Sequence, residues 1–129
     1  MWQSNNMGNI TINSETINKV CQDGFMAFLK SQVTLKINSI DVSIETSKIP
    51  YAYCLVTPSF EIENVLNDLY KFGKTNFTFN VTCQVSKLLK DGESLSIDIY
   101  AHNVQGSLTK KDDLLVFQID SISFNEKGK

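Results

Sequence analysis

Residues 77–85 alternate strictly between apolar and polar side chains. The apolar set is Phe77, Phe79, Val81, Cys83 and Val85. A period of two places such a set on one face of an extended strand. Lys90-Asp91-Gly92-Glu93 then supplies a turn, and the same alternation resumes over residues 95–101. The pattern predicts an antiparallel hairpin with one apolar face, which another layer has to cover.

A helix is predicted from Glu15 to Ser31, with Asn13 or Ser14 as its N-cap. Its apolar stripe, at three- and four-residue spacing, consists of Ile17, Val20, Cys21, Phe25, Phe28 and Leu29. Gly24 lies on this stripe, although a glycine inside a helix costs about 1 kcal/mol relative to alanine. We therefore expect a strand or a ligand to approach the helix backbone closely at Gly24.

A second, shorter helix is predicted after Pro58, with Ser59 as its cap and Gly73 at its end. Its stripe consists of Ile62, Val65, Leu66 and Leu69. The preceding run YAYCLV, at residues 51–56, is apolar on both sides. Such a run is typical of a central strand covered on both faces.

The two-residue period slips at Asn38-Ser39 and again at Asp120-Ser121. We interpret each slip as a β-bulge that bends a long strand while its apolar residues stay on the core face. Gly106 marks a further bend, and residues 110–113 form a charged loop tip.

Together these elements predict an α+β protein in which a strongly bent antiparallel sheet packs around one long amphipathic helix, with a second shorter helix. The alternative is a small closed barrel with the helices outside. A length of 129 residues indicates a single domain over 1–129, and we expect residues 1–8 and 125–129 to be frayed.

The chain has little of the chemistry that common enzymes use. All 12 basic residues are lysines, the net charge is -2, and His102 is the single histidine. The absence of arginine and of a basic surplus argues against phosphoryl transfer and against nucleic-acid partners. We predict a non-enzyme without a cofactor or a catalytic site, and place His102 at the surface. The rival hypothesis is an enzyme in which His102 acts with a distant carboxylate.

Cys21, Cys54 and Cys83 are far apart and have apolar neighbours, so we interpret them as buried thiols rather than a metal site. A strand-to-strand pair between Cys54 and Cys83 remains the alternative. The sequence shows no secretory signal and no membrane-spanning run. We therefore expect no integral membrane segment, and a location in the cytoplasm or export without a signal peptide.

The order of four segments resembles a half-module of the tubular lipid-binding superfamily, which includes the bactericidal permeability-increasing protein fold. The segments are INKVCQDGFMAFLKSQ, VTLKINSIDVSI, LSIDIYAHNVQGSL and LLVFQIDSISF. The small size and the arginine-free composition are similar to the small OrfX proteins of clostridial toxin clusters. This resemblance implies a curved sheet around a helix, lipid binding or protein interaction, and companion proteins of the same fold.

We accordingly predict a non-catalytic accessory protein that assembles with a protein partner or with itself. The alternative is a small protein that binds a lipid or another hydrophobic ligand. The residues expected to line an apolar groove, or else to fill the core, are Phe25, Met26, Phe28, Leu29, Phe77 and Phe79.

Overall fold

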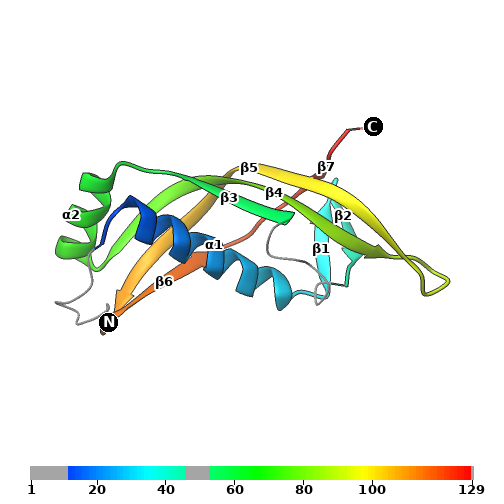
Figure 1. Ribbon diagram of the computed structural model, residues 1–129, viewed down its shortest axis with the longest axis horizontal. Coiled ribbons are helices and arrows are strands. Elements are labelled where there is room, and N and C mark those ends of the chain that lie inside the picture. Colours follow the sequence, from blue (N-terminus) through cyan, green and yellow to red (C-terminus); the bar gives the residue numbers. More distant parts are fainter. Residues whose placement is uncertain (1–11, 46–52, 129) are drawn as a thin grey trace.

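A computed structural model describes residues 12–45 and 53–128 (Figure 1). The predictions for residues 1–8, for Tyr51 and Ala52 and for Lys129 lie outside the described residues. The elements are, in chain order, α1 (Ser14–Lys30), β1 (Thr34–Ile37), β2 (Ile40–Ser43), β3 (Cys54–Ser59), α2 (Ile62–Phe72), β4 (Lys74–Leu88), β5 (Ser94–Lys111), β6 (Leu114–Ile119) and β7 (Asn125–Glu126).

The fold is α+β, as the sequence predicts. The main sheet is antiparallel and has the order β3-β4-β5-β6, while the short β7 also pairs with β5. The predicted hairpin is the long β4–β5 pair at its centre. β1 and β2 form a separate two-stranded sheet.

Helix α1 agrees with the predicted helix to within one residue at each end. The side chain of Asn13 caps it by accepting a hydrogen bond of 2.8 Å from the Thr16 N–H. The helix lies along the sheet (Figure 1) and contacts β3 and β6, the strands at the two ends of the four-strand order. A Cβ on Gly24 would lie 2.7 Å from the Cβ of Phe117 in β6, so the expected close approach at Gly24 is that of a strand.

Helix α2 also forms where its stripe predicts, with Val65 and Leu69 buried. Gly73 ends it in the left-handed conformation at a φ of 70°. The predicted cap was wrong, because Glu61 rather than Ser59 occupies the N-cap position and makes no capping hydrogen bond through its side chain.

Asn38 and Ser39 form the turn of a hairpin, not a bulge. They have φ angles of 51° and 66°, and Ile37 pairs directly with Ile40 across them. Two successive positive φ angles match the tight turn that suits the twist of two strands. The chain therefore reverses where we expected one bent strand, and Ile40 is 65% exposed instead of lying in the core.

The prediction of a central strand at YAYCLV was also wrong. β3 lies at one end of the sheet order, and its burial alternates, with Cys54 and Val56 buried and Leu55 62% exposed. Among the described residues, none buries the outer face of β3, where apolar Leu55 is followed by the polar residues Thr57 and Ser59.

At Asp120-Ser121 the strand does not bulge but ends, since β6 stops at Ile119. The chain resumes main-chain pairing at Phe124, whose N–H donates to Lys36 O at 2.8 Å. Residues Asn125 and Glu126 then form β7 beside β5, so the prediction that this end is frayed was wrong for them.

The irregularity in β5 lies at His102-Asn103, not at Gly106. The β4–β5 register shifts between Phe79, which pairs with Val104, and Val81, which pairs with Ala101. Asn103 has a φ of 55° and donates its N–H to the Asn80 side chain at 2.9 Å. Gly106 instead makes room for Phe79, because a Cβ there would lie 3.0 Å from the ring.

Cys54 and Cys83 are directly opposite each other in β3 and β4, with 4.1 Å between their Cα atoms, and form a disulfide. The interpretation of these two residues as separate thiols is therefore corrected, and the pairing alternative holds. Cys21 is free and lies on the buried side of α1. Burial raises the pKa of its thiol to about 12.

These assignments predict the outcome of thiol alkylation at pH 8. We expect no modified cysteine in the native protein, because a thiol with a pKa near 12 is almost entirely protonated and buried. One cysteine should react in denaturant, and all three should react after reduction. Mass spectrometry counts the modified cysteines. Three modified cysteines in denaturant without reductant would show that the disulfide is absent.

Candidate interaction surface

The six predicted groove residues meet in the interior. Phe25, Met26, Leu29, Phe77 and Phe79 are buried and Phe28 is half-buried. The Phe25 ring lies 6.1 Å from that of Phe79 and 6.4 Å from that of Phe124. The space between α1 and the sheet is therefore occupied by these side chains of the chain itself.

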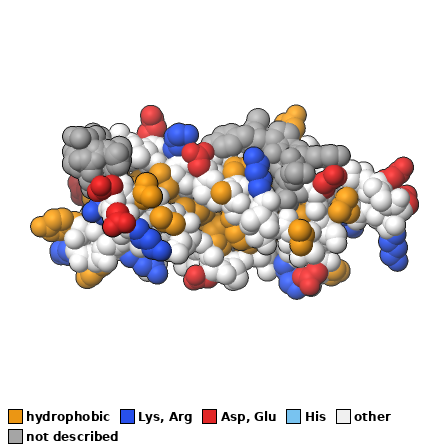
Figure 2. Space-filling model, turned by 90° about the horizontal axis from the view of Figure 1, so that it is seen from below, with side chains coloured by type: hydrophobic (Ala, Val, Ile, Leu, Met, Phe, Trp, Pro, Cys, Tyr) orange, Lys and Arg blue, Asp and Glu red, His pale blue; other side chains and the backbone are white. Residues whose placement is uncertain are grey.

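The exposed large hydrophobic residues lie on several separate elements. Figure 2 shows such side chains on one face as scattered groups among charged and polar ones. Two of the most exposed are on α2, where Tyr70 is 90% and Phe72 is 74% exposed. Leu66, 38% exposed, lies one turn before Tyr70. Tyr70 and Phe72 are outside the apolar stripe predicted for this helix, whereas Leu66 belongs to that stripe but is partly exposed.

The edge of β3 is the second notable surface. Gln22 on α1 donates a hydrogen bond from Nε2 to Cys54 O, and its Oε1 accepts one of 2.9 Å from the Val56 N–H. The helix thus binds the outer main-chain groups of this strand. No local pattern could have revealed this contact, because its partners are 32 and 34 residues apart in the chain.

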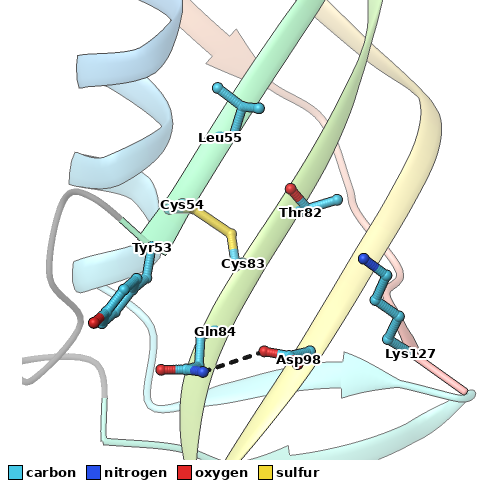
Figure 3. A pocket seen from close by; sticks show the side chains of 8 residues that line it. All are labelled: Tyr53, Cys54, Leu55, Thr82, Cys83, Gln84, Asp98 and Lys127. Atoms are coloured by element: carbon cyan, nitrogen blue, oxygen red, sulfur yellow. Dashed lines mark hydrogen bonds between the residues drawn. A yellow bond between two sulfur atoms is a disulfide. The ribbon is translucent and has the colours of Figure 1, made fainter. Parts of the chain in front are cut away.

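The outer face of the sheet has a shallow depression of about 250 Å³ (Figure 3). It is lined by Tyr53, Cys54, Leu55, Thr82, Cys83, Gln84, Asp98 and Lys127. Gln84 donates to the Asp98 carboxylate at 3.3 Å across it. Its volume is below the roughly 300–1,000 Å³ of typical small-molecule sites.

A larger open groove of about 550 Å³ follows the junction of α1 and β3. Asn18, Lys19 and Gln22 line its helix side, and residues 55–58 line its strand side. Lys19 forms an ion pair of 3.1 Å with Asp23 at the groove. The groove is therefore mixed in polarity, unlike the apolar cavity that a lipid chain requires.

His102 is exposed, as predicted, and its ring lies 5.0 Å from that of Tyr100. Within residues 12–45 and 53–128, His102 has this ring contact but no hydrogen bond to a carboxylate or a hydroxyl. In the same part of the chain, no group of three His, Cys, Asp or Glu side chains could hold a metal ion.

No helix of the described segments has the length and hydrophobicity needed to cross a membrane. No protein-family model, no curated protein and no solved structure matches the chain.

Proposed function

We propose that this chain is a non-catalytic accessory protein that assembles with a protein partner or with a second copy of itself. The observation that carries the proposal is the filled interior between α1 and the sheet. Phe25 and Leu29 are fully buried there, and Phe79 is 1% exposed. A lipid carrier needs an empty apolar cavity, whereas an interaction protein can have a filled core and bind through its surface.

The exposed aromatic side chains of α2 support the same function. Tyrosine is enriched among the residues that dominate the binding energy of protein interfaces, and phenylalanine is enriched at interfaces in general. Tyr70 and Phe72 have most of their surface in contact with solvent, although residues two apart point to different sides of a helix. A protein partner would remove this apolar surface from water.

The proposal includes the architecture that the resemblance implies, a sheet bent strongly around one long helix as in a half-module of the tubular lipid-binding superfamily. It is supported by the contacts of α1 with both β3 and β6, which lie at opposite ends of the sheet order. The likeness to small OrfX proteins belongs to the same proposal and suggests companion proteins of similar fold.

Native mass spectrometry of protein purified from cells, followed by lipid extraction, tests this function. We expect a lipid-free oligomer or hetero-complex. A stoichiometric lipid on a monomer that captures no protein would overturn the proposal in favour of the lipid-binding alternative. The enzyme alternative would need a demonstrated turnover that a folded His102→Ala variant loses.

A further inference from the structure

The two hydrogen bonds of Gln22 involve main-chain groups that a neighbouring strand would otherwise use. Cys54 and Cys83 face each other with a Cα separation of 4.1 Å. This short separation is typical of a non-hydrogen-bonded antiparallel pair, in which the N–H and C=O point away from the partner strand. Cys54 O and the Val56 N–H therefore point outward from the sheet, toward Gln22.

A carboxamide offers the same donor and acceptor as a peptide group. Gln22 binds the two main-chain groups of β3 that the N–H and C=O of one residue in an added parallel strand would otherwise bind. We propose that Gln22 closes the β3 edge of the isolated chain against strand addition. This role goes beyond the proposed function, because it concerns the chain alone and not its binding to a partner.

The composition of β3 explains why its edge requires such a contact. Exposed edge strands pair readily with other chains unless charged residues, proline, bulges or a covering element prevent it. Cys54–Ser59 has the sequence CLVTPS, which contains no charge, and Leu55 beside the edge is 62% exposed. Pro58 lacks an N–H and weakens pairing at one end, while Gln22 occupies the other end.

Hydrogen exchange of the Val56 amide measures the contact directly. In Gln22→Ala we expect its protection factor, relative to the amides of β4 and β5, to fall at least about fivefold, as expected for the loss of one hydrogen bond. Asn18→Ala is the matched control, since Asn18 is exposed one turn earlier on α1 and lines the same groove. It should leave Val56 unchanged.

The Gln22→Glu variant distinguishes the effect of the hydrogen bonds on Val56 protection from the effect of side-chain size, because Glu and Gln have nearly the same size. Below about pH 4 a protonated glutamic acid has both a donor and an acceptor, so protection of Val56 should approach that of the wild type. At pH 7 the carboxylate cannot donate to Cys54 O, and repulsion from this carbonyl oxygen disfavours the position in which the side chain accepts from the Val56 N–H. Protection should then fall, whereas Gln22→Ala should show no such recovery at low pH.

Light scattering tests the closing role itself. At equal concentration we expect Gln22→Ala to have a larger average mass than the wild type, and Asn18→Ala to equal the wild type. Unchanged Val56 protection, or lost protection without a gain in mass, would overturn the inference. The partner experiment above uses the unmodified chain, so either proposal can fail without the other.

Discussion

Replacement of Phe79 by alanine is expected to lower the free energy of unfolding by about 3–5 kcal/mol, the range for a buried phenylalanine. Phe79 is 1% exposed, and its ring lies 6.1 Å from that of Phe25 and 5.4 Å from that of Phe117. The Phe79 side chain of β4 thus packs against side chains of both α1 and β6. Truncation removes these contacts and leaves a cavity that elements fixed by main-chain pairing cannot close. Urea denaturation followed by circular dichroism measures the change.

Phe72→Ala is the matched control, because Phe72 is the same residue type but is 74% exposed on α2. We expect it to change the stability by less than about 0.5 kcal/mol. Equal losses for the two variants would contradict the placement of Phe79 at the centre of the core.

Gly24→Ala should destabilise the protein by about 1–3 kcal/mol, although alanine favours a helix by about 1 kcal/mol over glycine. The new Cβ would lie 2.7 Å from the Cβ of Phe117 and 2.9 Å from its ring. The Phe117 Cβ is bonded to the β6 main chain, so it cannot rotate away. Either α1 or β6 has to move, and thermal denaturation would show a lower Tm.

Ala27→Gly provides the comparison for helix propensity, since Ala27 is exposed on the same helix. It should cost about 0.5–1 kcal/mol through propensity alone. If Gly24→Ala instead raised the stability, the close approach of β6 to the helix would be disproved.

The elements that local periodicity determines were predictable. The alternation at residues 77–85 and the stripe from Ile17 to Leu29 lie in β4 and α1. In β4 every second side chain faces the core, and in α1 every third or fourth side chain does. The pattern of apolar residues therefore follows from burial. Gly24 was informative for a similar reason, because a glycine on an apolar helix face indicates a close neighbour.

Errors arose where one pattern fits two structures. A slip in the alternation is consistent with a bulge or with a two-residue turn. The positive φ angles of Asn38 and Ser39 show that this one is a turn. An apolar run on both faces suggested a central strand, yet β3 is an edge strand with Leu55 exposed. The Gln22 contact depends on how α1 and β3 meet in space, which no local pattern encodes.

The position of α1 between β3 and β6 has a consequence for synthesis on the ribosome. Gly24 and Phe117 are in contact but 93 residues apart, so α1 is translated well before the strand that packs against it. At roughly 5–20 residues per second, this interval lasts on the order of 5–20 seconds. During that time the side of α1 that later meets β6 remains accessible to water or to other proteins. The packing of α1 against the sheet can therefore be completed only after β6 has left the ribosomal tunnel.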